Sequence, residues 1–444
     1  MTGSAREVAL VTLTACEKQG AWSDLALKKN IRAAGLDSRD AALATRLCFG
    51  VQQNRLLLDF YLSRFSTVKL ERMERQVRNV LRLGIYQIAF LTKVPPSAAV
   101  HTSVELARRY SRNPRSPGLV NGILRSVARN AERLPVIGEQ NPAAYLSIRY
   151  SHPLWLVQEW MSVLGPEETE ALLAADNGRP PTAAQVNTIH FTVEYVVEAL
   201  RAQGVEAALH PWMPDCLLLR ATGDLEGLAP FQAGAFYIQD PAARAAVLAA
   251  GLEPGMRVLD ACAAPGGKSF ACAIAMEDRG GVFSCDIHSH KMALIDAGAR
   301  RLGLTCIHAA VQDAKARREG WTEGFDLVLA DVPCSGLGII RKKPDIRYKD
   351  PAPLKGLPAV QGDILDNISG YVKPGGVLLY STCTLLEREN GAVVDRFLAA
   401  HPEYAPEPFV LPGPAGEVPE GRLTLWPHIH DTDGFFIAKL RRRL

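Results

Sequence analysis

Apolar positions repeat with two different periods along this 444-residue chain. Over residues 1–140 they recur every three to four positions and form two clear stripes. These stripes are Val77, Val80, Leu81 and Ile88, and Val120, Ile123, Leu124 and Val127. Such spacing predicts amphipathic helices, so the first 140 residues are expected to be all helical.

From about residue 236, short apolar runs alternate with helix-like segments. The runs predict strands at residues 257–262, 281–287, 306–312, 325–330 and 376–380. The first four are continuous enough to be buried parallel strands. Near the C-terminus, LTLWPH and GFFIAKL are separated by only five residues and predict an antiparallel hairpin. We therefore expect an α/β Rossmann-like domain with a mostly parallel, seven-stranded sheet that ends in a hairpin.

Between these two regions lies a boundary signal. GRPPTAAQVNT, at residues 178–188, joins paired prolines to β-prone residues. We predict three domains: an all-helical domain at 1–140, linker helices with a small α+β domain at 141–235, and the α/β domain at 236–444. Ligands of a doubly wound sheet bind beyond the carboxyl ends of its strands, so functional residues are expected there.

Composition narrows the class of protein. Hydrophobic residues make up 48% and charged residues 22%, as in a soluble globular protein. No apolar run is long enough to span a membrane, and no signal-peptide pattern is present, so a cytoplasmic location is expected. The nine cysteines include no C-x-x-C pair. This argues against a zinc site or a disulfide framework, and no metal is expected.

Charge is distributed unevenly between the amino-terminal third of the chain and the remainder. Residues 1–140 hold 22 Lys and Arg against 11 Asp and Glu, whereas the remainder is mildly acidic. Arg75, Arg78 and Arg82 fall on the side of one predicted helix that faces away from its apolar stripe. A single basic helix face is usually just solvated, but the excess over the whole segment indicates contact with a polyanion.

The motif LDACAAPGGKS, at residues 259–269, follows the first predicted strand and opens a helix. Gly266 and Gly267 let a ligand approach the backbone, and the helix N-terminus offers free N–H groups. A Walker A loop would need glycine where Cys262 stands, and the G-x-G-x-x-G fingerprint is absent. A nucleotide-like ligand is therefore not expected to be gripped by its phosphates.

Aspartates follow three of the predicted strands, at Asp286, Asp313 and Asp331. Asp286 can accept hydrogen bonds from ribose hydroxyls, and Asp313 can meet an adenine amino group. Each alone could be a helix cap, but three at equivalent strand ends favour a ligand. An adenosine cofactor held without its phosphates indicates S-adenosylmethionine.

Two cysteines stand at strand ends that we expect to be neighbours, Cys334 in ADVPCSG and Cys383 in YSTC. One such cysteine is more often buried packing. Beside Asp331 and a methyl donor, the pair indicates attack of a thiolate on C6 of cytosine, which makes C5 nucleophilic. Asp331 would stabilise charge at N3, and the second thiol would assist release. Chemistry alone leaves open which cysteine attacks.

These motifs together resemble a known family. CAAPGGK, DVPCSG followed by RKKPDIRY, and KPGGVLLYSTC look like the bacterial RsmB (Fmu/Sun) 16S ribosomal RNA cytosine-5 methyltransferases. PPSAAVHTSVELARRY and LVNGILRSVARN are similar to the NusB-like RNA-binding domain at the N-terminus of that family. The resemblance extends over the whole chain.

The resemblance implies a role for each motif residue. It makes Cys383 the nucleophile, Cys334 the residue of product release and Asp331 the support at N3. The LEREN segment after Cys383 would lead the chain away from the site. S-adenosylmethionine would be bound by residues of the glycine turn and strand ends, namely Cys262, Ala263, Ala264, Pro265, Gly266, Gly267, Lys268, Asp286, Asp313 and Asp331.

We expect a monomeric enzyme that methylates an unpaired or flipped cytosine of 16S rRNA, with either free rRNA or a small-subunit assembly intermediate as the substrate. Neither DNA nor a membrane is expected as a partner. One alternative is the same cytosine chemistry on transfer RNA. Another is an RNA-binding assembly factor with a vestigial catalytic domain, against which the intact cysteines, Asp331 and glycine turn argue.

Overall fold

The computed structural model describes residues 3–19 and 23–444. The chain divides into two units by its contacts. The helical unit comprises residues 1–178 together with Ile340–Lys349, and the sheet unit comprises Arg179–Ile339 and Asp350–Leu444. A segment from the middle of the sheet-forming sequence therefore belongs to the helical unit. Within the described residues, no helix is both long and apolar enough to cross a membrane.

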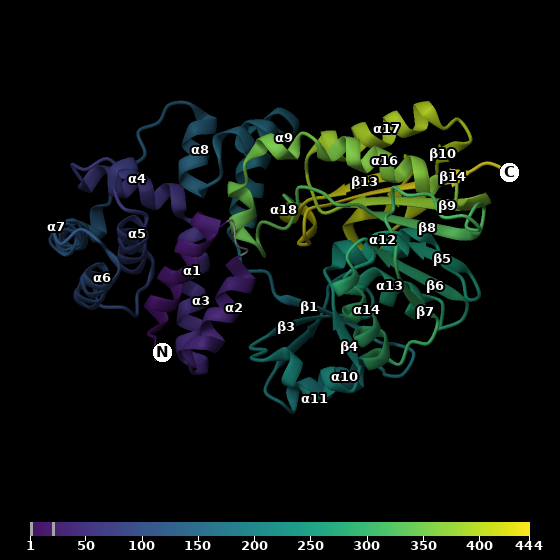
Figure 1. The fold of residues 1–444 in the computed structure, drawn as a ribbon, viewed down its shortest axis with the longest axis horizontal. Coiled ribbons are helices and arrows are strands. Elements are labelled where there is room, and N and C mark those ends of the chain that lie inside the picture. Colours follow the sequence, from purple (N-terminus) through teal and green to yellow (C-terminus); the bar gives the residue numbers. More distant parts are fainter. Residues whose placement is uncertain (1–2, 20–22) are drawn as a thin grey trace. The chain divides into compact units, whose positions relative to one another are not determined.

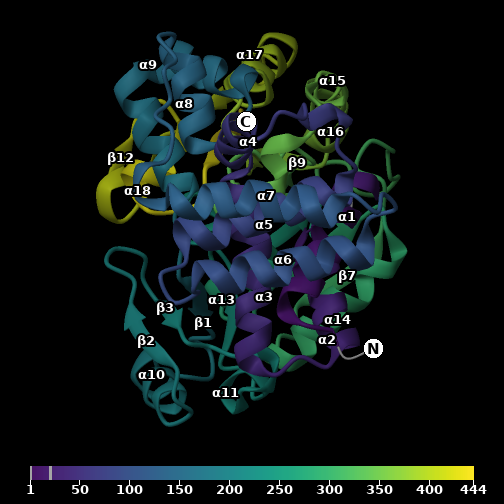
Figure 2. The same ribbon diagram turned by 90° about the vertical axis from the view of Figure 1, so that its left-hand side faces the viewer.

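The helical unit packs its helices around a central one, α5. Both predicted apolar stripes are confirmed, since Val77, Val80 and Leu81 are buried with the stripe at residues 120–127. The helices α5, α6 and α7 lie side by side (Figure 2). The unit contains α1 (Ala5–Gln19), α2 (Ser23–Ala34), α3 (Ser38–Gln53), α4 (Arg55–Phe65), α5 (Arg75–Phe90), α6 (Pro96–Tyr110), α7 (Ser116–Arg129), α8 (Pro142–Tyr150) and α9 (Leu154–Asp176).

The segment Ile340–Lys349 is held in the helical unit by buried polar contacts. It forms a short 3-10 helix, Pro344–Tyr348. The guanidinium of Arg347 is fully buried and donates to Asn177 Oδ1 at 2.7 Å and to the carbonyl of Tyr150 at 3.3 Å. The hydroxyl of Tyr348 donates to the carbonyls of Gln52 and Ser151, each at 2.9 Å. These bonds fix the segment against the ends of α3 and α8.

The sheet unit begins with a small α+β layer. Its antiparallel sheet has the order β2-β3-β1-β4. Asn187, just after β1, donates through Nδ2 to the carbonyl of Leu302 at 2.8 Å, and so ties this layer to the larger fold. The elements are β1 (Thr182–Val186), α10 (Val193–Arg201), β2 (Glu206–Leu209), β3 (Cys216–Arg220), α11 (Ala229–Gln232) and β4 (Phe236–Ile238).

The larger sheet has the order β10-β14-β9-β8-β5-β6-β7, with β13 paired to β14. The strands from β9 to β7 run parallel, and β14 is antiparallel to both β9 and β13, which confirms the predicted hairpin. Among the described residues this sheet has eight strands, one more than predicted, because the three-residue β10 joins its edge. The strands are β5 (Arg257–Asp260), β6 (Gly281–Asp286), β7 (Ile307–Val311), β8 (Phe325–Asp331), β9 (Val372–Thr382), β10 (Tyr404–Pro406), β13 (Arg422–Leu425) and β14 (Phe435–Arg442).

Helices cover both faces of this sheet (Figure 1). Alternate residues of β8 and β9 enter different cores: Leu327 and Leu379 face one side, and Val328 and Leu378 the other. This period of two is what a strand buried on both faces requires. One face carries α12 (Pro241–Ala250), α13 (Gly267–Ala275) and α14 (Ser289–Leu302), and the other α16 (Leu357–Ser369) and α17 (Gly391–Ala400).

Short elements complete the sheet unit. They lie in the connections around the larger sheet and include a separate two-stranded ribbon, β11 with β12. They are α15 (Pro351–Leu354), β11 (Phe409–Val410), β12 (Glu417–Val418) and α18 (Pro427–His430).

Candidate active site

The candidate site lies at the carboxyl ends of the parallel strands. The register of β8 and β9 sets Asp331 opposite Ser381, which confirms that these two strands are neighbours. The hydroxyl of Ser381 donates to Asp331 Oδ1 at 3.1 Å. The residues that follow each strand, Cys334 and Cys383, therefore emerge at the same edge of the sheet.

The structure brings the two cysteines into contact. The Sγ atoms of Cys334 and Cys383 lie 3.3 Å apart, although 49 positions separate the residues. The loop after Cys334 is tied to the other strand end, because Gly338 N–H donates to the carbonyl of Cys383 at 2.9 Å. A Cβ on Gly338 would lie 1.9 Å from the carbonyl oxygen of Gly434. Only glycine allows this approach, which closes the loop over the sulfur pair.

The electrostatic surroundings of Cys334 favour its neutral thiol. Contact with Cys383 and burial raise its pKa well above the ordinary value, and the nearby carboxylates of Glu389 and Asp331 act in the same direction. Cys334 therefore keeps its proton and can donate it toward the sulfur of Cys383.

Lys268 provides the cation of the site. Its Nζ lies 2.6 Å from Asp331 Oδ2 and 4.9 Å from the centre of the Phe435 ring. Burial opposes the charge on Lys268, but the ion pair with Asp331 outweighs it and raises the pKa of the ammonium. Sequence reasoning placed Lys268 with the cofactor and missed this pair, whose members stand 63 positions apart.

The glycine turn connects β5 to α13. The Ala263 N–H donates to the carbonyl of Cys285 at 2.7 Å, and Gly266 has a φ of +111°. The peptide between Ala264 and Pro265 is cis. Burial raises the pKa of Cys262, so this third cysteine stays a neutral thiol. The turn opens α13 at Gly267, whose first N–H groups have no partner within the helix.

Asp260, the last residue of β5, is a buried carboxyl group that sequence reasoning did not single out. It accepts a hydrogen bond from Ser269 Oγ at 2.7 Å, and Ser284 Oγ donates to Ser269 Oγ at 2.8 Å. Burial raises its pKa to about 6. The signal was its place at a strand end, the same signal that identified Asp331.

The other two aspartates lie at the same edge of the sheet. Asp286 ends β6, where its Oδ1 accepts from the N–H of His288 at 2.9 Å and its Oδ2 lies 3.3 Å from Lys291 Nζ. Asp313 follows β7 and accepts from the N–H of Lys315 at 2.9 Å. Both thus also shape their own turns, as expected for a carboxylate at a strand end. The structure places all three predicted aspartates along the β6, β7 and β8 ends.

The segment after Cys383 returns to the site, contrary to the expectation that LEREN leads away from it. Glu389 is fully buried, and its Oε2 accepts from the N–H of Ser335 and from Gln361 Nε2, at 2.9 and 3.0 Å. Thr384 Oγ1 lies 2.7 Å from Ser335 Oγ. These bonds join the segment after Cys383 to the loop that contains Cys334 and Ser335. The sequence did not predict that Glu389 is buried here, because a run of charged residues usually indicates an exposed segment and glutamate is rarely buried unless it is paired.

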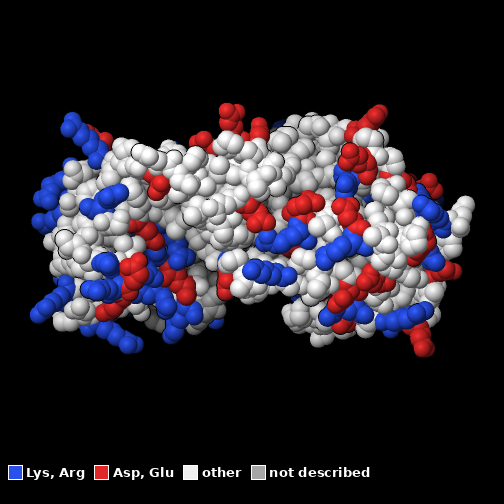
Figure 3. All heavy atoms as spheres, turned by 90° about the horizontal axis from the view of Figure 1, so that it is seen from above, with Lys and Arg blue, Asp and Glu red and all other residues white. Residues whose placement is uncertain are grey.

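Basic residues are frequent on the helical unit, and the structure divides them by exposure. Blue side chains gather over this unit in the face shown in Figure 3, with acidic ones among them. Arg75 is partly exposed, but Arg82 is only 2% exposed and binds Asp59 Oδ2 at 2.7 Å. The prediction that Arg82 lies on an outward face is therefore wrong. The spacing of apolar residues along the helix does not indicate this buried ion pair between Arg82 and Asp59.

Three family models match successive parts of the chain. They are the NusB family at residues 3–129, the RsmF/B-like ferredoxin-like domain at 152–226, and the 16S rRNA methyltransferase RsmB/F family at 247–441. Curated relatives match along the whole length. A probable ribosomal RNA small subunit methyltransferase B of Bacillus subtilis is 38% identical over 99% of both chains. The ribosomal RNA small subunit methyltransferase B of Klebsiella pneumoniae is 32% identical, over 92% of this chain and 91% of its own.

Solved structures share the fold. The crystal structure of PH0851 superposes with a TM-score of 0.82 at 24% identity, over 99% of this chain and 98% of that one. A methyltransferase homologue from Pyrococcus horikoshii gives 0.59 at 26% identity, over 68% of this chain and all of the other. With the full-length relatives and the site geometry, these matches lead to one assignment. The chain belongs to the RsmB/F family of S-adenosylmethionine-dependent methyltransferases.

Proposed function

We propose that this enzyme transfers a methyl group from S-adenosylmethionine to C5 of a cytosine in 16S rRNA, through a covalent bond between Cys383 and C6. One observation carries the proposal. Two thiols lie 3.3 Å apart beside an aspartate that is paired with a buried lysine. Methylation at a nitrogen needs no thiol, whereas C5 must first be activated by a nucleophile at C6.

Electrostatics supports Cys383 as the nucleophile. The ammonium of Lys268 is close enough to interact with Cys383, and a cation stabilises a thiolate. Cys334 instead faces the carboxylates of Glu389 and Asp331, which oppose a negative sulfur. We therefore assign the attack to Cys383, on which the charge of Lys268 acts, and proton retention to Cys334.

The Lys268–Asp331 pair serves the ring of the base. Attack at C6 pushes electrons toward N3, and a proton delivered there neutralises them. The ammonium of Lys268 supplies this proton through the carboxylate of Asp331, and the hydroxyl of Ser381 holds that carboxylate in place. The return of the same proton restores the pair when the base is released.

Release requires that C5 lose its proton and that the Cys383–C6 bond break. After methyl transfer, the C5 proton passes to a water molecule that enters the site, the electrons of the C5–H bond form the C5=C6 double bond, and the electrons of the C6–S bond go to the Cys383 sulfur, which leaves as a thiolate. Cys334 lies in contact with that sulfur and assists its departure by donating a hydrogen bond to it. The hydrogen bond from Gly338 N–H to the carbonyl of Cys383 fixes the backbone that carries the leaving sulfur.

The strand-end residues fit an adenosine cofactor that is not held by phosphates. The free N–H groups of α13 and the carboxylates of Asp286 and Asp313 match carboxylate, hydroxyl and amino groups. We assign residues 262–268, Asp286, Asp313 and Asp331 to this site. When bound, S-adenosylmethionine supplies an electrophilic methyl group. The protein's part is to hold the base with C5 facing it and to exclude water.

The relatives named for ribosomal RNA support the choice of RNA. The basic helical unit would hold flanking phosphates while an unpaired or flipped base enters the site. We further propose that the enzyme acts in the cytoplasm as a monomer, on free 16S rRNA or on an assembly intermediate. The domain boundaries near residues 140 and 235 remain predictions.

A tritium-release assay tests the reaction. 16S rRNA and transfer RNA are transcribed with cytidine that carries tritium at C5, and each is incubated with the enzyme and S-adenosylmethionine. We expect one tritium released per methyl group gained, from 16S rRNA only. Methylation without tritium release would overturn the C5 assignment, and release from transfer RNA alone would overturn the substrate. Failure to bind S-adenosylmethionine in calorimetry would indicate a non-catalytic RNA-binding factor.

A further inference from the structure

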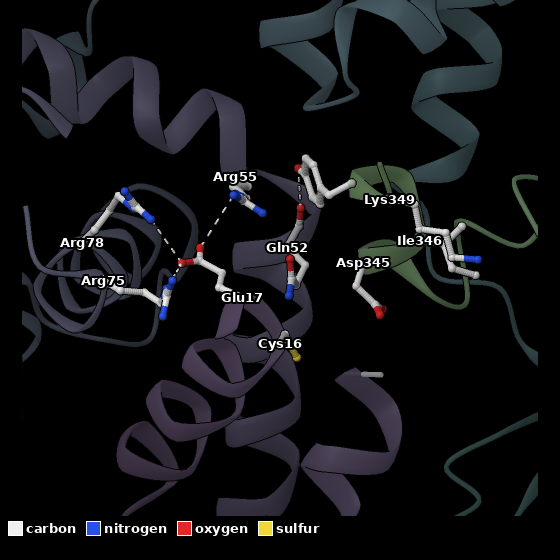
Figure 4. A pocket seen from close by; sticks show the side chains of 10 residues that line it. Cys16, Glu17, Gln52, Arg55, Arg75, Arg78, Asp345, Ile346 and Lys349 are labelled. Atoms are coloured by element: carbon white, nitrogen blue, oxygen red, sulfur yellow. Dashed lines mark hydrogen bonds and ion pairs between the residues drawn. The ribbon is translucent and has the colours of Figure 1, made fainter. Parts of the chain in front are cut away.

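The helical unit contains a cavity of about 390 Å³ that is lined by basic side chains. Figure 4 shows Arg55, Arg75 and Arg78 pointing toward one carboxylate, that of Glu17. The opposite wall is formed by Asp345, Tyr348 and Lys349 of the segment Ile340–Lys349. This volume is in the range of ligand sites in proteins.

The arginines outnumber their carboxylates. Nitrogen atoms of Arg55, Arg75 and Arg78 lie 3.8, 3.7 and 3.3 Å from the Glu17 carboxylate. Arg82 also binds Glu17, and its second partner is Asp59. Four guanidinium groups thus share two carboxylates. Lys349 and Asp345 add one charge of each sign, so the cavity keeps a surplus of about two positive charges.

Neutral side chains complete the wall without changing this balance. Burial raises the pKa of Cys16 to about 12, so its thiol carries no charge. Burial also raises the pKa of Tyr348 to about 12, and the Arg55 guanidinium lies 4.7 Å from the centre of its ring. A site with surplus arginine, a rigid aromatic wall and open access suits an anion with several oxygens.

We propose that this cavity binds the phosphodiester backbone of an RNA strand, through Arg75, Arg78 and Lys349. The inference rests on the proposed function, since it names where the substrate's backbone is held. Glu17 holds the arginines in fixed rotamers before the RNA arrives, and their outward N–H groups meet phosphate oxygens. Arg75 is the most accessible of the three arginines, with 41% of its side chain exposed.

The cavity also involves the segment Ile340–Lys349, which belongs to the helical unit although it follows Cys334 in the sequence. Lys349 is in the segment that begins six residues after Cys334 and is anchored by Arg347 and Tyr348. An RNA phosphate in the cavity would touch helices α1 and α5 and this segment at once. Correct docking of the segment is therefore part of RNA recognition.

The test measures binding of a fluorescent single-stranded RNA to the full chain, over a range of salt concentrations and without S-adenosylmethionine. Arg75→Gln, Arg78→Gln and Lys349→Gln are compared with Arg125→Gln and Lys93→Gln, which remove exposed cations of the same unit outside the cavity. Each cavity variant is expected to weaken binding roughly five-fold and to lower the salt slope by about 0.7. Each control should change affinity less than about two-fold.

Equal losses in the cavity variants and controls would show diffuse attraction and overturn the proposal. Unchanged binding in all three cavity variants would also overturn it. So would a competition experiment in which inorganic phosphate displaces the RNA no better than sodium chloride does at the same ionic strength. The unfolding midpoints of the variants must match that of the wild type. If Arg78→Gln does not fold, Arg75→Gln still tests the proposal, because Arg75 is the more exposed of the two side chains. Because no methyl transfer is measured, a failure of the C5 chemistry leaves this result intact.

Discussion

Both units of the chain hold a partly buried carboxylate beside cations, but they balance its charge differently. In the sheet unit, Asp331 meets one cation, Lys268, at 2.6 Å. In the helical unit, Glu17 lies within 4 Å of four arginines. A balanced pair suits an uncharged base, to which the pair gives a proton during the reaction and from which it takes the proton back. A surplus of cations suits a polyanion that must be held and not transformed.

The difference shows that the number of ion pairs is a poor guide to function. The two regions differ in the net charge that is left after the ion pairs are counted: the Lys268–Asp331 pair is neutral, whereas the group around Glu17 keeps an excess of positive charge. Exposed pairs contribute little to stability, and buried ones cost desolvation, so neither arrangement is explained by stability alone. Four substitution experiments can break or sharpen this comparison, the largest effect first.

The two cysteines should differ in outcome despite their contact. Cys383→Ala is expected to abolish methylation, by about 10⁴-fold or more, and to give no covalent RNA adduct. Cys334→Ala should still attack, and because release fails, an adduct that survives a denaturing gel should accumulate. The gel of RNA-bound protein, with and without S-adenosylmethionine, measures this. An adduct in Cys383→Ala and none in Cys334→Ala would mean that the roles are exchanged.

Breaking the balanced pair should lower the rate of the chemical step. Lys268→Met leaves Asp331 without its cation and removes the proton for N3, so kcat is expected to fall about 10²- to 10³-fold. The matched control is Lys373→Met, which breaks a lysine–aspartate pair of the same 2.6 Å length at the amino-terminal end of β8. Single-turnover methylation at saturating RNA measures the effect. Equal rates in the two variants would contradict the role of Lys268.

A third charge arrangement holds the segment Ile340–Lys349: a buried guanidinium that donates to amide and backbone oxygens, while the charges of Asp176 and Asp345 also act on it. Burial lowers the pKa of Arg347, and its N–H groups donate to Asn177 and to backbone carbonyls. Arg347→Met leaves these acceptors unsatisfied, so the free energy of unfolding should fall by about 3 kcal/mol. Urea unfolding measures it, with the exposed Arg279→Met as control. A wild-type midpoint in Arg347→Met would show that other contacts hold the segment.

The sequence predicted the sheet well, because each buried strand is encoded in its own residues. The order of β8 and β9 then followed from topology, and with it the approach of Cys334 to Cys383. The Lys268–Asp331 pair could not be predicted in the same way, since it depends on a side chain that reaches from the first turn of α13 to the end of β8. Nor could the return of Glu389, whose partners lie on two other segments.

The segment Ile340–Lys349 was the hardest to predict. Its basic run RKK is of a kind that is usually solvated, yet Arg341 is only 8% exposed. Arg347 and its partner Asn177 stand 170 positions apart. No local period connects them, because the contacts are specific hydrogen bonds and not apolar stripes. The Glu17 cavity was missed for the same reason: its walls come from four parts of the chain.

The smallest predicted effect is a difference in pH dependence between the two units. Asp260 has a pKa raised by burial to about 6 from an ordinary 3.8, so the folded state binds its proton more tightly. Its contribution to stability is present below about pH 4 and is lost as pH rises through about 6. Burial also opposes the charge of Glu17, but Arg82, Arg55 and Arg78 outweigh it and lower its pKa below 4.5. Its contribution is present above that pH and is lost as pH falls.

Asp260→Asn and Glu17→Gln remove these titrations one at a time. Relative to Asp260→Asn, the wild type should lose about 2 kcal/mol of unfolding free energy as pH rises from about 4 to 7. Relative to Glu17→Gln, it should gain stability as pH rises from the acid side through about 4.5, and then stay level. Urea unfolding over this pH range gives both differences. If the two differences change in the same direction with pH, Asp260 and Glu17 do not have opposite electrostatic environments, and the contrast between a carboxyl group kept neutral by burial and one kept charged by arginines fails.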